Sequence, residues 1–274
     1  LDFKEYAVVH STVELAKNHK IKISPSFVNA VLKNVILDRD VIKLTKIDFN
    51  SLPNWLVGQT NDKTISEKNS FLNTIIDKPS LHIVFKNSDL IKFFTNKNTR
   101  ASNKSLFVNE YSQIDKLARY NDGDWWVQDF SSMLPISLTP NLEKKTVIDL
   151  CSAPGGKSFQ LLSNKNKIKM IEINPKRAKV LEKNLKRLNF ENTVIIEDAR
   201  RLETKTKFDC VIVDAPCSSV GTIRRNPEIF YRHSAPDFQY ITSIQYKFLN
   251  KAKNLVKNNG IIIYMACSFL SNEG

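Results

Sequence analysis

This sequence of 274 residues contains only four cysteines, and no two of them have CxxC spacing. The lack of that spacing argues against a zinc site, and four scattered thiols do not make the framework of a disulfide-stabilised domain. No run approaches the roughly 18 consecutive apolar residues of a membrane span, and no basic-then-apolar signal segment opens the chain. Repeats and low-complexity segments are absent as well. We therefore expect a cytoplasmic globular protein that binds neither a metal nor a membrane.

Acidic residues are also scarce, because 28 Asp and Glu stand against 41 Lys and Arg, for a net charge of +13. The surplus is uneven: residues 1–140 carry 18 basic and 15 acidic side chains, whereas residues 141–274 carry 23 and 13. A lysine-rich composition with only 7 glycines is the alternative explanation, but such a bias would not concentrate charge in one half. The charge favours a polyanionic partner, most simply a nucleic acid.

The first half of the chain is predicted to be helical and then mixed. Apolar residues recur at helical spacing over residues 6–16 and 27–36, and Ser24-Pro25-Ser26 is typical of a helix start. Residues 51–56 break this pattern, which fits a linker or short turn. From about residue 65 to 140, short strand-like runs such as 81–85 and 106–109 alternate with polar loops. We expect a helical segment over residues 1–50 and a small α+β subdomain over residues 51–140.

From residue 141 onward the pattern changes to alternating strands and helices. Predicted strands cover residues 146–150, 169–173, 193–196, 208–214 and 261–265, and predicted helices begin near 157 and cover 175–188 and 240–256. Such alternation predicts a parallel sheet with helices on both faces. Ligands of these sheets bind at the carboxyl ends of the strands, where the strand order reverses. The motifs below all follow predicted strands, so we expect them at that edge.

The first motif is Asp149-Leu150-Cys151-Ser152-Ala153-Pro154-Gly155-Gly156-Lys157, between the first strand and the first helix of this half. Paired glycines allow a tight turn and a close approach to a ligand, and the helix N-terminus offers free N–H donors. The string is neither GxGxxG nor a Walker A loop. A Gly-Gly turn alone is weak evidence and more often a structural loop than a ligand site, but the whole nine-residue string is far more specific.

Two further acidic residues follow the next two strands. Glu172 ends the second, where a carboxylate can accept both hydroxyls of a ribose, although a solvated strand-end residue fits equally well. Asp198 follows the third strand, where it could accept a hydrogen bond from the amino group of an adenine. Considered alone, it could equally be a helix N-cap. Together with Asp149, these three acids at three successive strand ends favour an adenosyl ligand with a ribose.

Cysteines follow the last two strands. Cys217 lies in the segment after Asp214, and Cys267 lies in Tyr264-Met265-Ala266-Cys267-Ser268. Free cysteine is often a small buried hydrophobic residue, and Cys210 within a strand fits that description. Cys217 and Cys267 instead follow the carboxyl ends of their strands, at the edge where ligands bind, so we expect them to face one crevice.

The strings DLCSAPGGK, IEINPKR, DAR, DAPCSSVGTIRRNPEI and YMACS together resemble the RsmB (Sun) branch of the RNA cytosine-5 methyltransferases. GDWWVQDFSSML is similar to the segment before that family's catalytic core, SFVNAVLKNV to the last helix of its NusB-like RNA-binding domain, and LPNWL to the connector after it. The resemblance implies a Rossmann-like class I methyltransferase sheet over residues 141–274, preceded by part of a NusB-like domain. It also implies S-adenosylmethionine as cofactor and RNA as substrate, and we expect a monomer.

The resemblance implies a role for each site residue. Cys267 would add to carbon 6 of a cytosine, because carbon 5 is not nucleophilic enough to attack a sulfonium methyl unaided. Cys217 would assist loss of the carbon-5 proton and release of the enzyme. Asp214 would hydrogen-bond the base at N3 and N4, and Lys157 would lower the thiol pKa or orient the base. The residues expected to hold the cofactor are Cys151, Ser152, Ala153, Pro154, Gly155, Gly156, Lys157, Glu172, Arg177, Asp198 and Asp214.

Other features qualify the resemblance. Arg224 and Arg225 could meet phosphate or be solvated loop charges, and the target base must leave any stack to enter the crevice. The family usually has Thr where this chain has Ala266. The chain begins with Leu1 and ends at Gly274 directly after a strand-like run, so we expect it to be incomplete at both ends, with apolar sheet surface exposed.

We expect methylation of small-subunit ribosomal RNA, in the 16S molecule. Transfer RNA is an open alternative, because related enzymes use the same core. A non-catalytic RNA-binding protein would need neither Cys217 nor Cys267. A class I methyltransferase for DNA or small molecules is disfavoured by the two cysteine motifs.

Overall fold

The computed structural model describes residues 4–18, 23–45, 48–60, 63–77, 79–94, 98–111, 113–232 and 234–273, so Leu1 and Gly274 lie outside it. The chain forms two compact units, residues 1–52 and residues 53–274. The finer boundary expected near residue 140 stays a prediction. Among the described residues, no helix is both long and apolar enough to cross a membrane.

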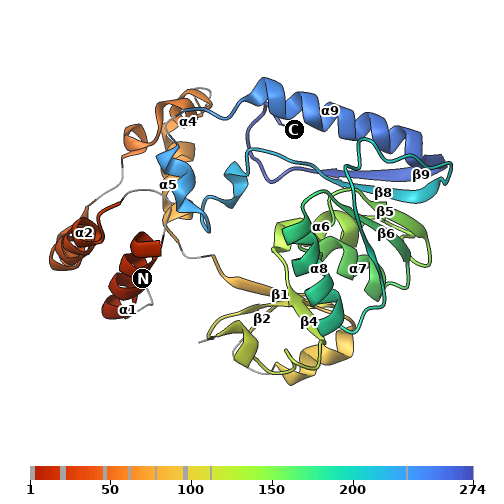
Figure 1. The fold of residues 1–274 in the computed structure, drawn as a ribbon, viewed down its shortest axis with the longest axis horizontal. Coiled ribbons are helices and arrows are strands. Elements are labelled where there is room, and N and C mark those ends of the chain that lie inside the picture. Colours follow the sequence, from red (N-terminus) through yellow and green to blue (C-terminus); the bar gives the residue numbers. More distant parts are fainter. Residues whose placement is uncertain are drawn as a thin grey trace. The chain divides into compact units, whose positions relative to one another are not determined.

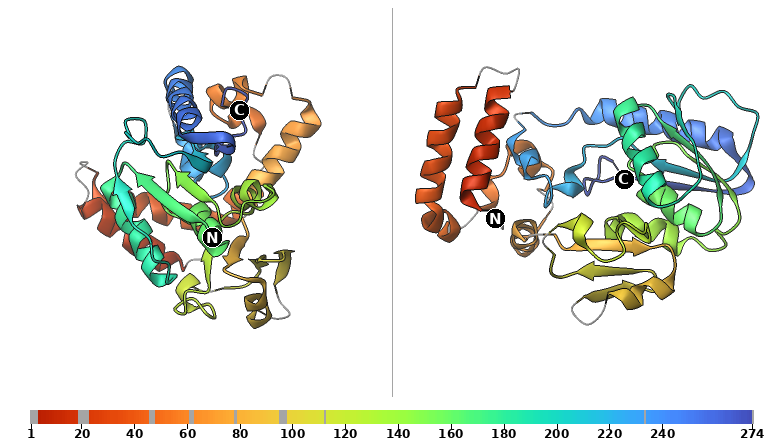
Figure 2. Two further views of the ribbon diagram at one scale, coloured as in Figure 1. Left: turned by 90° about the vertical axis from the view of Figure 1, so that its right-hand side faces the viewer. Right: turned by 60° about the horizontal axis from the view of Figure 1, so that its bottom comes forward.

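The first unit is helical, as the spacing predicts. Its elements are α1 (Glu5–Asn18), α2 (Pro25–Leu37), α3 (Arg39–Leu44) and the 3-10 turn η1 (Phe49–Ser51). Ser24 caps α2, because its side chain accepts a hydrogen bond from the backbone N–H of Phe27 and Pro25 occupies the first turn. Helices α1 and α2 pack side by side (Figure 2), yet neither contains a buried residue.

The second unit begins with short helices where we expected only a linker or turn. α4 (Asn54–Gly58) begins within residues 51–56 and follows Pro53, whose fixed φ suits the position before a helix. Leu56 is fully buried, so apolar burial stabilises a helix that its length alone would not. The prediction for residues 51–56 was therefore wrong in its second half.

A four-stranded antiparallel sheet follows, in the order β2-β3-β1-β4. The elements of this part are α5 (Ile65–Ile76), β1 (Leu81–Phe85), η2 (Ser88–Phe93), β2 (Thr99–Ser102), β3 (Ser105–Val108), η3 (Ile114–Lys116), β4 (Trp125–Val127) and α6 (Phe130–Leu138). The strand predicted at residues 81–85 is confirmed. Both faces of β1 are buried, because one packs on the sheet's own small core around Phe85 and Trp125 and the other on the core beside α6.

The expected parallel sheet is confirmed, with five strands in the order β7-β6-β5-β8-β9 (Figure 1). Its elements are β5 (Thr146–Asp149), α7 (Gly156–Ser163), β6 (Lys167–Glu172), α8 (Pro175–Arg187), β7 (Val194–Ile196), β8 (Phe208–Asp214), η4 (Val220–Thr222), η5 (Pro227–Tyr231), α9 (Phe238–Leu255) and β9 (Val256–Met265). All four neighbouring pairs are parallel.

Alternate residues of the central strands face two separate cores. Val147, Met170 and Ile212 pack with residues of α6, α7 and α8, whereas Ile148 and Val211 pack with residues of α9 on the other face. A strand buried on both faces gives a continuous apolar run, which explains the sequence pattern of β5 and β8.

The last strand differs from the prediction at its start. β9 begins at Val256, directly after α9, and its pairing with β8 shifts between Phe208 and Cys210. The sequence signal at residues 257–260 is polar, so periodicity alone found only the apolar part from Ile261. β9 stands at one end of the sheet order, where Ile261 and Ile262 are 37% and 36% exposed.

Candidate active site

The strand order places β5 next to β8 at the point where the chain changes direction across the sheet. From β5 the chain proceeds outward to β6 and β7, and it then returns to β8 and β9 on the other side. Asp149, Glu172, Asp214 and Met265 are the last residues of β5, β6, β8 and β9. The predicted motifs therefore do gather at the carboxyl edge of the sheet, where such folds bind ligands.

Gly155 fixes the turn between β5 and α7. Its φ is +115°, and a Cβ atom at this position would lie 2.1 Å from Cζ of Phe159. No other residue type fits both the backbone conformation and the space. The carbonyl oxygen of Gly155 accepts the first helical hydrogen bond, from the Phe159 N–H at 2.8 Å. Gly155, predicted to make a tight turn, thus also leaves space for the side chains of Phe159 in α7 and Leu181 in α8.

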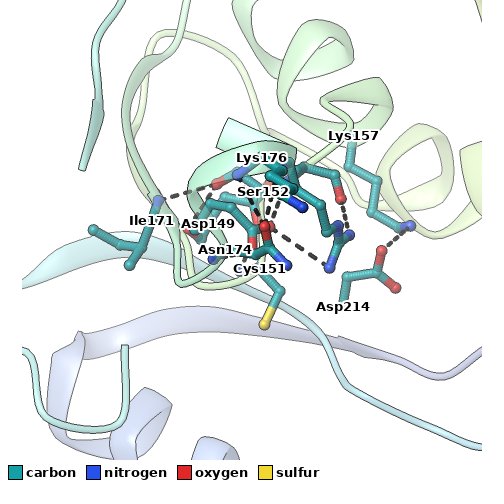
Figure 3. A network of polar contacts seen from close by, with 11 residues as sticks. Asp149, Cys151, Ser152, Lys157, Ile171, Asn174, Lys176 and Asp214 are labelled. Carbon is teal, nitrogen blue, oxygen red and sulfur yellow. Dashed lines mark hydrogen bonds and ion pairs between the residues drawn. The ribbon is translucent and has the colours of Figure 1, made fainter. Parts of the chain in front are cut away.

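Asp149 lies under this loop and is almost fully buried. Its carboxylate accepts a hydrogen bond from Oγ of Ser158 at 2.7 Å. The carboxylate also accepts from the Cys151 N–H at 3.2 Å, while the carbonyl of Asp149 accepts from Oγ of Ser152 at 2.9 Å (Figure 3). Burial raises the pKa of Asp149 to about 6, against the lowering effect of these hydrogen bonds. Asp149 therefore holds the loop and the start of α7 together.

Glu172 is also buried, with a side-chain exposure of 1%. Its carboxylate accepts hydrogen bonds from the N–H groups of Asn174 at 2.9 Å and Ala153 at 3.3 Å. Arg177 lies 3.7 Å from it and donates to the carbonyl of Ala153. These contacts fix the direction of the carboxylate, so the alternative of a solvated strand-end residue is excluded.

Asp198 forms a bidentate ion pair with Arg200, with distances of 2.9 Å to Nε and 2.7 Å to Nη2. The hydrogen bonds and charge of Arg200 hold the pKa of Asp198 below its ordinary value. The chain makes a turn after Asp198 and no helix begins there, so the helix N-cap alternative is excluded.

Glu172 and Asp198 line a cavity of about 430 Å³, which we call the Glu172 cavity, and Asp149 is not among its lining residues. Of the predicted site residues, its lining includes Cys151, Glu172, Arg177, Asp198, Asp214, Cys217 and Cys267. Apolar side chains of Ile173, Ile244 and Phe248 also line it. Ser152, Ala153, Pro154, Gly155 and Gly156 are not among the lining residues and form the loop beside it. A mixed apolar and polar cavity of this size is typical of small-molecule sites.

A second cavity of about 610 Å³ shares Cys267 with the first, and we call it the Arg225 cavity. It is lined by Pro79, Asp129, Ser131, Ser132, Pro135, Lys157, Asp214, Gly221, Thr222, Arg224, Arg225, Tyr264, Met265, Ala266, Cys267 and Ser268. Asp214, Thr222 and Cys267 line both cavities. These three residues therefore form a wall shared by two sites.

The two strand-end cysteines are in contact beside these shared residues: Cys267 lines both cavities, and Cys217 lines only the Glu172 cavity. The backbone N–H of Cys267 donates a hydrogen bond to Sγ of Cys217 at 3.2 Å. Cys267 is exposed and Cys217 half-buried, whereas Cys210 is fully buried in the core, as predicted. Burial raises the pKa of the Cys210 thiol to about 12, which leaves it chemically inert. The expectation that Cys217 and Cys267 face one crevice is confirmed.

Lys157 extends from α7 to Asp214, with 2.7 Å between its Nζ atom and Oδ2 of Asp214 (Figure 3). Desolvation and the negative charge of Asp214 raise the pKa of the Cys267 thiol, and the positive charge of Lys157 acts in the opposite direction. Lys157 thus offsets the effect of the Asp214 carboxylate on the pKa of the exposed thiol. It lines the Arg225 cavity and not the Glu172 cavity.

The paired arginines of the loop after Cys217 are engaged within the protein. Arg225 forms an ion pair with Asp129, and Arg224 donates a hydrogen bond to the carbonyl of Asp77 at 3.1 Å. Desolvation acts to raise the pKa of Asp129, but hydrogen bonds from Ser131 and the charge of Arg225 hold it below its ordinary value. Both arginines line the Arg225 cavity, so neither is merely a solvated loop charge.

Sequence reasoning gave no role to Asp129 or Glu273. Asp129 precedes a helix as its N-cap, and this local signal says nothing of a cavity. Glu273 is buried beside the Cys217 loop, and nothing in its neighbourhood in the sequence indicates that contact. Among the described residues, no group of three or more His, Cys, Asp or Glu side chains is placed to hold a metal ion.

Comparisons with known proteins agree with this architecture. The family model described as 16S rRNA methyltransferase RsmB/F matches residues 135–274, and the NusB family model matches residues 1–37. The chain is similar to ribosomal RNA small subunit methyltransferase B of Shewanella oneidensis, with 25% identity over 98% of this chain and 66% of that one. It is 33% identical to the protein of that name from Photorhabdus laumondii, over 57% of this chain and 38% of the other.

Among solved structures, the fold resembles NSun6 from Pyrococcus horikoshii, solved with SFG. The TM-score is 0.69 at 18% identity, over 82% of this chain and 86% of that one, so the likeness concerns the fold alone. The chain spans 66% and 38% of the lengths of the two curated relatives.

Proposed function

Because this chain belongs to the 16S rRNA methyltransferase RsmB/F family, we propose that it transfers a methyl group from S-adenosylmethionine to carbon 5 of a cytosine in 16S ribosomal RNA. The observation that carries the proposal is the contact of Cys217, which lines one cavity, with Cys267, which lines both. A methyl donor in one cavity and a base in the other would meet beside the residues that the two cavities share. A protein that only binds RNA needs no such pair of thiols.

The Glu172 cavity suits the cofactor. Its buried, hydrogen-bonded carboxylate is directed by Ala153 and Asn174 and can accept the two hydroxyls of a ribose. Asp198 lies farther along the same lining, where it can accept from the amino group of an adenine, and Phe248 offers an apolar surface. S-Adenosylmethionine, when bound, supplies a methyl group on a positively charged sulfur. The structural neighbour was solved with SFG, an analogue of this cofactor.

The Arg225 cavity suits the nucleotide. A cytosine that has left its stack can enter beside Cys267, with its phosphates near Arg224 and Arg225. Asp214 lies at the shared wall, where its carboxylate can accept hydrogen bonds from the N4 amino group or from a protonated N3. Lys157 holds Asp214 in place and neutralises its charge next to the thiol.

Cys267 begins the chemistry as a thiolate. Its sulfur forms a bond to carbon 6, and the electron pair of the 5,6 double bond moves toward carbon 5, which becomes the nucleophile. Carbon 5 would take the methyl group as the donor's methyl–sulfur bond breaks and its electron pair returns to that sulfur. Cys217, deprotonated, then accepts the proton from carbon 5. The electron pair then restores the double bond, the bond from carbon 6 to sulfur breaks, and Cys267 leaves as a thiolate. The two thiols act on adjacent carbons, which agrees with the short separation of their residues.

A trapping assay with RNA that contains 5-azacytidine tests these roles. In the wild type we expect a covalent protein–RNA adduct that survives denaturing electrophoresis, because a nitrogen at position 5 has no proton to release. Cys267→Ala should form no adduct and transfer no methyl group. Cys217→Ala should accumulate an adduct even with ordinary RNA, because the release step fails.

Cys210→Ala is the matched control, since it removes one thiol that lies outside both cavities. It should trap RNA as the wild type does. Adduct formation by Cys267→Ala at the wild-type level would overturn the assignment of the nucleophile. A wild type that traps no RNA and transfers no methyl group would overturn the proposed function itself.

A further inference from the structure

Glu273 is a carboxylate buried outside both cavities. It is 3% exposed and lies beyond the end of β9, six residues after Cys267. A buried carboxylate is costly unless several donors compensate for its lost hydration. Its surroundings should therefore show what it holds in place.

Two side chains and one backbone group donate to Glu273. The Ser218 N–H lies 2.7 Å from Oε1, the Ser218 hydroxyl donates to Oε2, and Nε2 of Gln245 lies 3.4 Å from Oε1. Ser218 directly follows Cys217, and Gln245 belongs to α9 and also donates to the carbonyl of Pro216 at 3.2 Å. The Glu273 carboxylate thus connects the loop that follows Cys217 to its own segment, which follows Cys267.

Other contacts join the same two segments at closer range. The Gly221 N–H donates to the carbonyl oxygen of Cys267 at 2.9 Å, and the hydroxyl of Ser218 lies 3.4 Å from that of Ser268. A Cβ atom on Gly221 would lie 3.0 Å from the Cys267 carbonyl oxygen, so only glycine allows this approach without displacement. Ser219 has a φ of +62°, a left-handed conformation that a serine adopts only when its neighbours hold it.

We propose that Glu273 is a positioning residue that sets the separation of the two thiols by holding the loop of Cys217 against the segment of Cys267. The inference rests on the proposed function, because the separation matters only if both thiols act on one base. Neither thiol touches Glu273 through a hydrogen bond, so the residue acts through Ser218. A displacement of about 1 Å is enough to slow a positioned reaction by about 100-fold.

The test compares Glu273→Ala and Glu273→Gln with the wild type. Alanine removes the acceptor of the buried Ser218 N–H, and it leaves the Ser218 hydroxyl and Gln245 with only their contacts to Ser268 and Pro216. Glutamine keeps one carbonyl oxygen for the two N–H donors, and the Ser218 hydroxyl can turn to accept from its amide. We expect Glu273→Ala to lower kcat by about 100-fold with KM for the cofactor changed less than about twofold, and Glu273→Gln to restore kcat to within about threefold.

A second measurement follows the thiols without the reaction. The alkylation rates of Cys217 and Cys267 by iodoacetamide, followed by peptide mass spectrometry in the absence of RNA, report on the two loops directly. Glu273→Ala should change the ratio of the two rates by about fivefold or more, and Glu273→Gln should not. Ser218→Ala keeps the backbone contact and removes only the hydroxyl, so it gives a milder variant if Glu273→Ala does not fold. It should shift the ratio in the same direction.

Glu203→Gln, at an exposed glutamate of the same unit, is the control and should match the wild type in both assays. Glu273→Ala that methylates within about twofold of the wild type, or folded variants with an unchanged alkylation ratio, would overturn the inference. If the wild type is inactive but Glu273→Ala still alters the alkylation ratio, the result would support the positioning role of Glu273 and overturn the proposed function.

Discussion

The Glu172 cavity is bounded mainly by residues that directly follow strands of the parallel sheet, whereas the Arg225 cavity gathers segments that span residues 79 to 268. The two also differ in how their charges are satisfied. Asp149 and Glu172, under and within the first, are buried and bound by backbone N–H and hydroxyl groups. Asp129 and Arg225 in the second form a partly exposed ion pair with each other.

The difference suggests how each cavity meets its ligand. Buried carboxylates that accept backbone hydrogen bonds keep one orientation, which suits a cofactor of constant shape. A partly exposed ion pair contributes little to stability, so Arg225 can exchange its partner for a phosphate at small cost. The Glu172 cavity, which we propose for the cofactor, is thus preformed, and the Arg225 cavity, which we propose for the RNA, can rearrange.

Gly155→Ala should have the largest effect, because it disrupts the turn between β5 and α7 beside the preformed Glu172 cavity. The new Cβ would overlap Phe159, and alanine at a φ of +115° is strained, so the free energy of unfolding should fall by about 4 kcal/mol. Urea unfolding followed by circular dichroism measures this loss. Gly58→Ala is the matched control, since a Cβ there would meet nothing within 4 Å. It should be neutral or stabilise by about 0.5 kcal/mol. Equal effects of the two substitutions would contradict the steric argument.

The next largest effect concerns the pH dependence of stability, to which Asp149, beside the Glu172 cavity, and Asp129, in the Arg225 cavity, should contribute with opposite sign. The pKa of Asp149 is about 6 in the folded protein and about 3.9 in the unfolded chain, so the folded state binds the proton more tightly. Stability from this group therefore falls as the pH rises from about 4 to about 6, by about 3 kcal/mol in total. Asp129 acts in the opposite direction: its lowered pKa gives stability that is present above the unfolded pKa and is lost as the pH falls.

Asp149→Asn isolates the first contribution, because asparagine keeps an oxygen for the Ser158 hydroxyl and does not ionise. Urea unfolding at pH 4.5 and pH 7, run on both proteins, should show the variant gaining stability relative to the wild type at the higher pH. All other titrating groups are common to both proteins and cancel. The same pH dependence in both would show that burial of Asp149 has no energetic consequence.

Asp129→Asn should have the smallest effect. It should change the affinity for RNA and leave the stability of the protein nearly unchanged. Asparagine still caps α6, so stability should change by less than about 0.5 kcal/mol, while Arg225 loses its carboxylate partner. We expect RNA affinity to rise about fivefold at low salt, a gain of about 1 kcal/mol, with a salt dependence steeper by about one phosphate contact. Filter binding at several salt concentrations measures both.

Asp237→Asn is the control for this variant, since Asp237 caps α9 from an exposed position and lines neither cavity. Its RNA affinity and salt dependence should equal those of the wild type. An unchanged salt dependence in Asp129→Asn would mean that Arg225 does not exchange its partner for phosphate.

Much of the fold could be predicted from the sequence where local signals were strong. The helix after Ser24, the strand at residues 81–85 and the strand at residues 208–214 follow from capping and apolar patterns, and they are confirmed. The short helix α4 and the start of β9 were missed, because burial of Leu56 and pairing with β8 stabilise segments whose own sequence gives no such signal.

The sequence by itself determined the edge at which the site forms. Alternating strands and helices predict a parallel sheet, in which the carboxyl ends of the strands share one edge, so the residues after β5, β6, β8 and β9 lie at that edge. Only the tertiary structure decided which of these residues touch. Lys157 pairs with Asp214, Arg225 with Asp129 and Glu273 with Ser218, across 57, 96 and 55 residues of chain. Periodicity and capping act over a few residues, whereas contacts at such separations depend on how the packed elements meet.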